Sequence, residues 1–170
     1  DAQRERAHLC GQALGLGLAQ RLHAQGHKVI LTGRRQALLD QAIAGQPGMT
    51  SIANDITDPA QIADLAARLA KDYPDLSVII HNAGIMQAER LGANATPLDV
   101  SEAIIATNLL GPIRLTHALM PQLLAQPQAA IITVSSGLAF VPLAATPTYS
   151  ASKAAIHSWT QSLRHQLSGT

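Results

Sequence analysis

Hydrophobic and polar positions along the chain follow two alternating periods. Residues 16–26 carry apolar side chains at helical spacing and close on Gly26, and residues 27–33 form a short apolar run that ends in Gly33. The same succession continues along the sequence, and this alternation of helices and strands predicts βαβ units. Further helices are expected over 36–45, 59–73, 98–124 with a bend at Gly111-Pro112, and 148–167, and further strands near 49–55, 76–84 and 129–134.

The order of these elements predicts the fold class. Strands joined by crossover helices form a mainly parallel sheet that is covered on both faces. We therefore expect an α/β fold of the doubly wound Rossmann type, in a single domain over residues 1–170. In such a sheet, ligands lie at the carboxyl ends of the strands.

Composition and charge narrow the functional classes. The 170 residues are 47% apolar and 14% charged, which suffices for one packed core. The 12 basic and 11 acidic residues are scattered, so we expect neither a nucleic acid nor a membrane as partner. One cysteine, Cys10, and the lack of a signal peptide or spanning segment predict a cytoplasmic protein. The seven histidines have no accompanying cysteine or carboxylate cluster, so a metal site is not favoured.

A glycine-rich stretch opens the sequence. Gly11, Gly15 and Gly17 have the spacing that lets a backbone approach a phosphate at a helix N-terminus. Residues 4–6 before them are Arg-Glu-Arg, where a buried strand is expected, and unpaired charges are costly to bury. Only residues 7–10 are expected to form a short strand. We hypothesise that the sequence before the glycines has been replaced or read in another frame.

The first informative strand end carries Arg34 and Arg35. A carboxylate here would bind an adenosine ribose, whereas adjacent arginines without one suit a 2′-phosphate. The pair therefore favours NADP over NAD. Taken alone, an exposed arginine pair at a helix start is the simpler interpretation.

Three further strand ends carry small or polar residues. Asp55-Ile56, the pair after the third strand, is by itself typical of a turn or helix start. The small residues within His81-Asn82-Ala83-Gly84, after the next strand, allow a nucleotide to lie against the backbone. A strand-ending turn explains them equally well. The groups are Asp55-Ile56, His81-Asn82-Ala83-Gly84 and Ser135-Ser136-Gly137.

Tyr149 and Lys153 stand four apart on the last predicted helix and hence on one face. An ammonium beside a phenol favours the phenolate and lowers the phenol pKa from roughly 10 toward neutrality. Such a tyrosine can act as a general acid and base. Taken alone, a Tyr-x-x-x-Lys pair is common on helix surfaces.

The ordered set of motifs resembles the short-chain dehydrogenase/reductase family, in which an Asn-Ser-Tyr-Lys tetrad acts on a nicotinamide cofactor. Ser136 lies thirteen positions before Tyr149, and Asn108 stands in the preceding helical region. The resemblance implies that Tyr149 exchanges a proton with the substrate oxygen, to which Ser136 donates a hydrogen bond. It further implies that Lys153 binds the nicotinamide ribose and that Asn108 holds a water connecting Lys153 to solvent.

The same resemblance implies an NADP site. The glycines are expected under the pyrophosphate, the arginines at the 2′-phosphate, the Asp-Ile pair at the adenine and the Asn-Ala-Gly turn along the adenosine and ribose. The implied cofactor residues are Gly11, Gly15, Gly17, Arg34, Arg35, Asp55, Ile56, Asn82, Ala83, Gly84, Tyr149 and Lys153.

The sequence departs from the family's pattern at both ends. Besides the atypical first strand, it stops at Thr170 after the catalytic helix, where the family continues. We therefore expect a sheet that lacks the C-terminal strands and has residues 129–134 at an uncovered edge. The resemblance also implies a homodimer or homotetramer built on residues 112–125 and the Tyr149 helix.

Two functions remain open at this point. The first is an NADP-dependent oxidoreductase that transfers hydride between nicotinamide and a small carbonyl or secondary alcohol substrate. The alternative is a truncated or inactive nucleotide-binding domain without turnover. A serine hydrolase is poorly supported, because Ser136 lacks a Gly-x-Ser-x-Gly turn.

Overall fold

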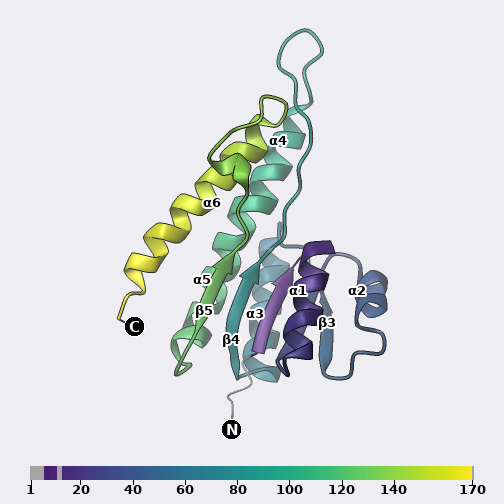
Figure 1. Cartoon of the computed structure of the whole chain (residues 1–170), viewed down its shortest axis with the longest axis vertical. Coiled ribbons are helices and arrows are strands. Elements are labelled where there is room, and N and C mark those ends of the chain that lie inside the picture. The colour runs from purple at the N-terminus through teal and green to yellow at the C-terminus, as the bar shows by residue number, and fades with distance from the viewer. Residues whose placement is uncertain (1–5, 11–12, 170) are drawn as a thin grey trace.

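A parallel sheet of five strands forms the centre of the protein, in the order β3-β2-β1-β4-β5 (Figure 1). The computed structural model describes residues 6–10 and 13–169. The expected α/β fold of doubly wound Rossmann type is confirmed. The strands are β1 (Arg6–Cys10), β2 (Lys28–Gly33), β3 (Met49–Ala53), β4 (Leu76–His81) and β5 (Ala130–Thr133).

Helices connect the strands in the expected order. The helical region expected over 98–124 consists of three consecutive segments, and a single turn of 3-10 helix follows β5. The helices are α1 (Ala13–Ala24), α2 (Gln36–Ile43), α3 (Pro59–Asp72), α4 (Leu98–Ile105), the π-helix η1 (Ala106–Leu110), α5 (Gly111–Leu124), the 3-10 helix η2 (Gly137–Ala139) and α6 (Pro147–Gln166).

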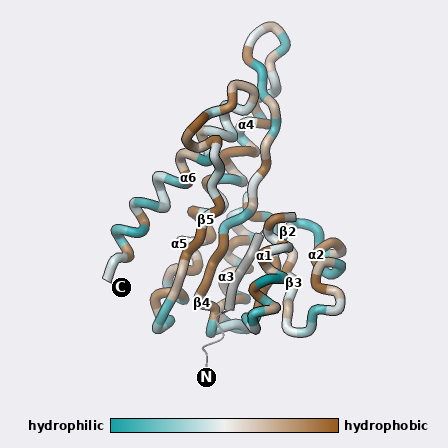
Figure 2. The backbone as a smooth tube through the Cα atoms, in the orientation of Figure 1, coloured by the Kyte–Doolittle hydropathy of each residue, from teal (hydrophilic) through white to brown (hydrophobic). Residues whose placement is uncertain are grey.

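Two apolar clusters pack on opposite faces of the sheet. One joins β2, β3 and β4 to α3 and α5, and the other joins the same strands to α1 and α2. In β2, Ile30 belongs to the first cluster, whereas Val29 and Leu31 belong to the second, as the alternation of side chains along a strand requires. Figure 2 shows β4 and β5 as hydrophobic stretches of the backbone in the middle of the molecule. Burial on both faces explains the continuous apolar runs of β2 and β4 in the sequence.

The first strand is longer than the sequence suggests. The expectation that only residues 7–10 form a strand is wrong by one residue, because β1 begins at Arg6. Arg6 pairs with Lys28 and with Leu76, the first residues of β2 and β4. Lys28 is exposed, so this end of the sheet borders solvent and backbone pairing here can include a charged residue.

The bend in the long helical region lies slightly earlier than expected. It is the π-helix η1, which ends at Leu110, and Gly111 N donates to Ala106 O, five residues back. Pro112 has no N–H to donate to the carbonyl of Asn108, four residues earlier, so a regular α-helix is interrupted at this point. The interruption therefore places Asn108 in the irregular turn.

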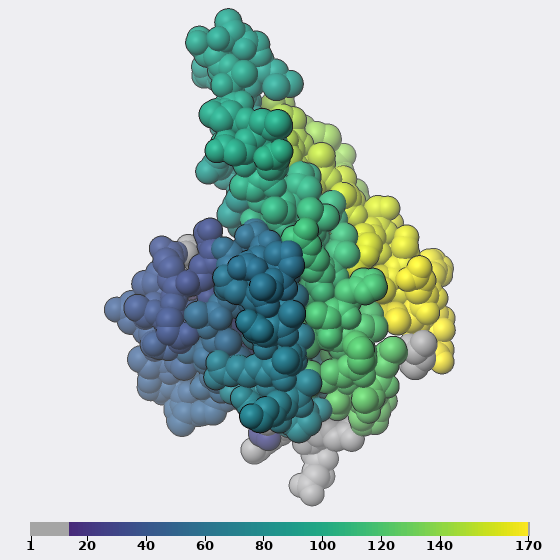
Figure 3. Space-filling model, turned by 180° about the vertical axis from the view of Figure 1, so that it is seen from behind, coloured from purple at the N-terminus to yellow at the C-terminus, as the bar shows by residue number. Residues whose placement is uncertain are grey.

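A long loop projects from the carboxyl end of β4. Residues 82–97 join β4 to α4, and part of this segment stands clear of the body of the molecule in Figures 1 and 3. Helix α6 packs beside α4 and η1 and reaches β5. β5 lies at an edge of the sheet, as expected, with Ile132 46% exposed. Within the described residues, none of the helices combines the length and apolar character that crossing a bilayer requires.

Candidate active site

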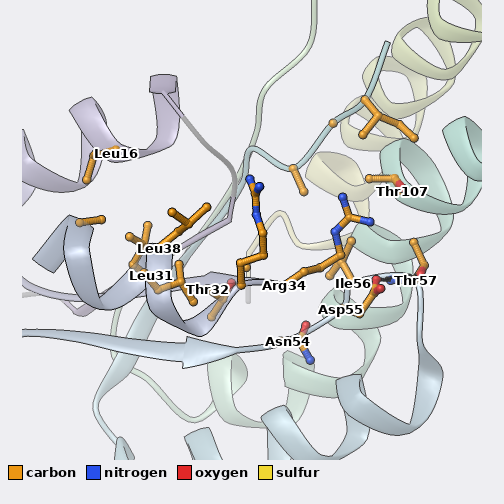
Figure 4. Close-up of a pocket in the computed structure, with 17 residues that line it drawn as sticks. Leu16, Leu31, Thr32, Arg34, Leu38, Asn54, Asp55, Ile56, Thr57 and Thr107 are labelled. Atoms are coloured by element: carbon orange, nitrogen blue, oxygen red, sulfur yellow. Dashed lines mark hydrogen bonds between the residues drawn. The ribbon is translucent and has the colours of Figure 1, made fainter. Parts of the chain in front are cut away.

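A cavity of about 520 Å³ opens at the carboxyl ends of β2 and β3 and at the turn after β4. In Figure 4, Leu16, Leu31 and Leu38 lie toward one end of it and Thr57 and Thr107 toward the other. Several predicted cofactor residues line it, as do residues that the sequence did not single out. The predicted ones are Arg34, Arg35, Asp55, Ile56, Ala83 and Gly84; the others include Leu16, Thr32, Asn54, Thr57, Ile85 and Thr107.

Three other predicted cofactor residues lie next to the cavity without being part of its lining. Gly15 and Gly17 flank the lining residue Leu16 in the first turns of α1, and Asn82 precedes the lining residue Ala83. Gly11 lies outside the described residues. The structure thus brings most of the predicted cofactor residues to one edge of the sheet.

Gly17 is exposed on α1, and a Cβ added to it would meet no atom within 4 Å. Its φ is not positive, so neither its conformation nor packing requires glycine at this position. Gly15, by contrast, is buried. Gly17 lies in the second turn of α1, next to the helix N-terminus, where the free N–H groups of the first turn and the helix dipole attract phosphate.

Arg34 follows the last residue of β2, and Arg35 occupies the N-cap position of α2. Both are exposed, and within the described part of the chain neither forms an ion pair with a carboxylate. The next residue, Gln36, ties the turn to β3, since its Oε1 accepts a hydrogen bond of 2.9 Å from Ala53 N. Two guanidinium groups therefore remain available to an anion at a fixed turn.

The turn after β3 is fixed from two sides. Asp55 Oδ1 accepts hydrogen bonds from Thr57 N at 2.9 Å and Thr57 Oγ1 at 2.7 Å. On the other side, a Cβ on Gly111 would come within 2.6 Å of Ile56 Cγ1 and 2.7 Å of Ile56 O. Only glycine allows the start of α5 to approach this closely, so Ile56 forms a firmly held wall of the cavity.

Gly84 connects the cavity to the predicted catalytic residues. It lines the cavity, and a Cβ on it would lie 3.4 Å from Lys153 Nζ and 3.5 Å from Asn108 Oδ1. Its neighbour Ala83 packs against the core between the sheet, α3 and α5. Two of the four tetrad residues therefore meet at the end of β4.

Lys153 is only 5% exposed. Its Nζ donates a hydrogen bond of 2.8 Å to Val134 O, just after β5, and lies 5.8 Å from the centre of the Tyr149 ring. Burial lowers the pKa of the Lys153 ammonium below its ordinary value. The predicted placement of Tyr149 and Lys153 on one face of α6 is thus found in the structure.

Asn108 is buried, and its carboxamide is fully engaged. Oδ1 accepts from Ile85 N at 2.8 Å, while Nδ2 donates to Ile85 O and to Ser152 Oγ, both at 3.0 Å. Ser152 in turn donates to Tyr149 O at 2.7 Å. Asn108 therefore connects the loop after β4 to α6 directly behind Tyr149.

Ser136 caps the short helix η2, which packs against α6. Its Oγ accepts a hydrogen bond of 3.2 Å from Leu138 N. That bond uses a lone pair of the oxygen, so the hydroxyl hydrogen remains for another acceptor. Ser136 thus keeps the donor that its predicted role requires.

Some residues that shape the site were missed from the sequence. Thr57 had a recognisable signal, because Asp-x-Thr after a strand is typical of a side-chain-capped turn. Ser152 stands directly before Lys153, yet its bond to Asn108 spans 44 positions and leaves no local pattern. Glu89 in the projecting loop also had no signal. His81 at the end of β4 is buried, and its Nε2 lies 2.7 Å from Thr116 Oγ1, so this histidine is a core contact.

The sequence of residues 9–170 matches the model of the short chain dehydrogenase family. An uncharacterized oxidoreductase of Bacillus subtilis, DltE, is 41% identical over 157 residues, which are 92% of this chain and 62% of that protein. An uncharacterized oxidoreductase of Staphylococcus saprophyticus is 31% identical over 164 residues, covering 92% and 68% of the two chains. The chain thus spans about 62% of the length of its Bacillus relative.

Solved structures give the same assignment. Serine dehydrogenase from Escherichia coli is similar, with a TM-score of 0.89 and 27% identity over 97% of this chain and 77% of that one. The closed form of serine dehydrogenase complexed with NADP+ has the same TM-score, 0.89, and identity, 27%, over 97% and 67% of the two chains. Sequence, fold and comparisons agree, and the chain belongs to the short-chain dehydrogenase family of oxidoreductases.

Proposed function

We propose that this chain is an NADP-dependent oxidoreductase that transfers hydride between a nicotinamide and a small carbonyl or secondary alcohol substrate. The observation that carries the proposal is the position of Gly84. It lines the cavity, and a Cβ on it would lie 3.4 Å from Lys153 Nζ. A dinucleotide bound along the cavity therefore reaches the helix that carries Tyr149 and Lys153.

The residues present fit such a cofactor. The open space beside Gly17 suits the pyrophosphate, and the glycine at position 84 keeps the floor of the site low where the ribose and nicotinamide would pass. Asp55, Ile56, Asn82 and Ala83 border the region proposed for the adenosine. When bound, the nicotinamide supplies or accepts the hydride.

The preference for NADP rests on Arg34, assisted by Arg35. Guanidinium groups bind phosphate through paired N–H donors, and the turn after β2 offers no carboxylate for a ribose hydroxyl. The similar serine dehydrogenase structure is a complex with NADP+, which supports the same preference. We assign Arg34 the main contact with the 2′-phosphate, because it directly follows β2.

Tyr149 is proposed to give a proton to the carbonyl oxygen during reduction and to take one from the alcohol in reverse. Lys153 supplies positive charge 5.8 Å from the ring centre, which stabilises negative charge on the phenol oxygen as the proton leaves. Lys153 is also proposed to bind the ribose hydroxyls. Its present acceptor, Val134 O at 2.8 Å, is one of three that an ammonium can use.

Ser136 is proposed to donate its free hydroxyl hydrogen to the substrate oxygen and to stabilise the charge that develops there. For Asn108, we propose that the main-chain carbonyl, rather than the carboxamide, holds the water that connects Lys153 to solvent. Both amide hydrogens are already donated to Ile85 O and Ser152 Oγ. Pro112 cannot donate to the Asn108 carbonyl in the helical pattern, which leaves that oxygen for water.

Three wider expectations remain proposals. We propose that residues 1–170 form a single dinucleotide-binding domain, because both apolar clusters share the same sheet. We propose a homodimer or homotetramer through residues 112–125 and α6. We also propose a cytoplasmic location, in keeping with the single cysteine, and no nucleic-acid or membrane partner, because the charges are scattered along the sequence.

The test separates binding from turnover. NADPH binding is measured by fluorescence titration, and turnover by incubating the protein with NADPH deuterated at the transferable position and a panel of aldehydes and ketones. Deuterium in a product alcohol, detected by mass spectrometry, is the expected result. Binding without transfer would favour the alternative of a nucleotide-binding domain without turnover. If the protein neither binds NADPH nor transfers deuterium, both functions are contradicted.

A further inference from the structure

Helix α6 is capped by a residue that is remote in sequence. Its N-cap residue, Thr146, makes no side-chain capping bond, and its first residue, Pro147, has no N–H. The next N–H, that of Thr148, donates to Glu89 Oε1 at 3.0 Å. Glu89 thus satisfies a donor at the start of the helix, where a negative charge is also favoured by the helix dipole.

Glu89 binds further partners with its second oxygen. Oε2 accepts from Thr148 Oγ1 and from Ser101 Oγ of α4, both at 2.6 Å. Its main-chain N–H donates to Ala145 O at 2.9 Å, in the segment that leads into α6. These hydrogen bonds hold the carboxylate ionised and lower the pKa of Glu89. One residue therefore joins the projecting loop, α4 and the start of α6.

The position of Glu89 relates this junction to the reaction. Thr148, its main partner, directly precedes Tyr149. Four residues before Glu89, Ile85 is held at both main-chain groups by Asn108. Residues 86–88 are exposed and span between these two fixed points, from the cavity to the N-terminus of α6.

We propose that Glu89 is a positioning residue for the reaction described above. It fixes the first turn of α6, which carries Tyr149, to the loop after β4 through its bonds to Thr148 and Ala145. Glu89 is not part of the cavity lining, so it acts through Thr148 and the loop without contact to the cofactor. The proposal rests on the proposed function for its kinetic readout, but the junction itself can be measured without turnover.

The bonding pattern predicts which substitutions are tolerated. In Glu89→Gln, the amide oxygen can accept from Thr148 N, while the amide NH2 can donate to the hydroxyls of Thr148 and Ser101, which also act as acceptors. Glu89→Leu leaves all three donors without this partner. We therefore expect Glu89→Gln to retain most of the turnover that Glu89→Leu loses.

The experiment compares Glu89→Leu and Glu89→Gln with Glu102→Gln, an exposed acid on α4 that serves as the control. We expect kcat to fall at least tenfold in Glu89→Leu, with less than a threefold change in Glu89→Gln and none in the control. The Kd for NADPH should stay within twofold in all three variants, because Glu89 is not among the residues that line the cavity. A kcat within twofold of the parent in Glu89→Leu, or a parallel loss of NADPH affinity, would overturn the proposal.

Amide hydrogen exchange gives a readout that does not depend on activity. In Glu89→Leu, the Thr148 amide should exchange at least tenfold faster, while amides in the middle of α3 stay unchanged. Unchanged exchange at Thr148 would overturn the proposal even if the protein is active. If the parent protein shows no turnover, the proposed function fails, whereas the junction is still supported or refuted by exchange in Glu89→Leu and its recovery in Glu89→Gln.

Discussion

The carboxamide of Asn108 is bonded to both main-chain groups of Ile85, accepting from N at 2.8 Å and donating to O at 3.0 Å. Its other amide hydrogen reaches Ser152, which donates to the carbonyl of Tyr149. One buried side chain therefore connects the loop after β4, where Ile85 lines the cavity, to the helix that carries the proposed acid and base.

Replacing Asn108 with alanine should lower both stability and turnover. The substitution leaves Ile85 N and Ile85 O without their partner, and an unsatisfied buried group costs about 1–3 kcal/mol. We expect a loss of this size in the free energy of unfolding, measured by urea denaturation, together with a kcat reduced at least tenfold. Asn94→Ala, in the exposed loop, should leave both unchanged. Equal behaviour of the two variants would contradict the ordering role of Asn108.

Tyr149→Phe should abolish proton transfer while retaining the cofactor. Loss of a general acid and base lowers the rate by roughly 100-fold or more. We expect kcat to fall by at least this factor with the Kd for NADPH within threefold of the parent. Tyr73→Phe, at the end of α3, serves as the control. A loss of NADPH binding with unchanged turnover per bound complex would count against the assignment.

Arg34→Asp should shift the cofactor preference from NADPH toward NADH. A charge-assisted hydrogen bond contributes about 1.5–3 kcal/mol, so the Kd for NADPH should rise roughly tenfold to a hundredfold. Binding of NADH should improve or stay constant, because the new carboxylate can accept from a ribose hydroxyl. Arg164→Asp makes the same charge change on exposed α6 outside the cavity. An unchanged ratio of the two affinities would refute the assignment.

Gly17→Ala should affect stability and binding in opposite directions. Alanine is favoured over glycine in a helix by roughly 0.5–1 kcal/mol, and nothing lies within 4 Å of the added Cβ. The free energy of unfolding should therefore stay constant or rise, while the methyl group occupies the space proposed for pyrophosphate and raises the Kd for NADPH at least tenfold. Gly45→Ala is the reverse control, since a φ of +72° makes it destabilising without an effect on binding. Unimpaired NADPH binding by Gly17→Ala would remove α1 from the cofactor site.

The Glu89 junction should make stability depend on acid pH. Hydrogen bonds to Ser101 and Thr148 lower the pKa of Glu89 in the folded protein below the ordinary value of 4.5. Its contribution is therefore complete above this value and is lost as the pH falls through the lower folded pKa. The difference in unfolding free energy between the parent and Glu89→Gln should be constant near neutral pH. Below about pH 4.5 the parent should lose stability relative to Glu89→Gln. A pH-independent difference would show that the carboxylate is not held ionised by these contacts.

Periodicity made the sheet and its helices predictable. Continuous burial along β2 and β4 produces apolar runs that can be recognised from sequence. The ends of the helices and strands were less predictable from the sequence, because they depend on tertiary contacts. β1 includes Arg6 through pairing with two neighbouring strands, and the helix expected over 36–45 ends at Ile43.

The residues of the candidate site likewise fall into those that could be predicted from the sequence and those that could not. Arg34, Asp55 and Gly84 follow strands and could be located because the carboxyl ends of parallel strands share one edge. Glu89 could not be found, since its bonds to Thr148 span 59 positions and an isolated acid in a loop has no local pattern. Residues that support the site from a distance become visible only when the fold brings their partners together.

The tight approach of Gly111 to Ile56 has a geometric consequence for the whole site. Gly111 begins α5, and Asn108 lies three residues earlier in the contiguous turn η1. There is no room for even a methyl group at Gly111, so the start of α5 lies directly against the turn after β3. It acts as a spacer of constant length between the wall proposed for the adenine and the residues proposed for proton transfer. The span available to the proposed dinucleotide is thereby set by the backbone itself.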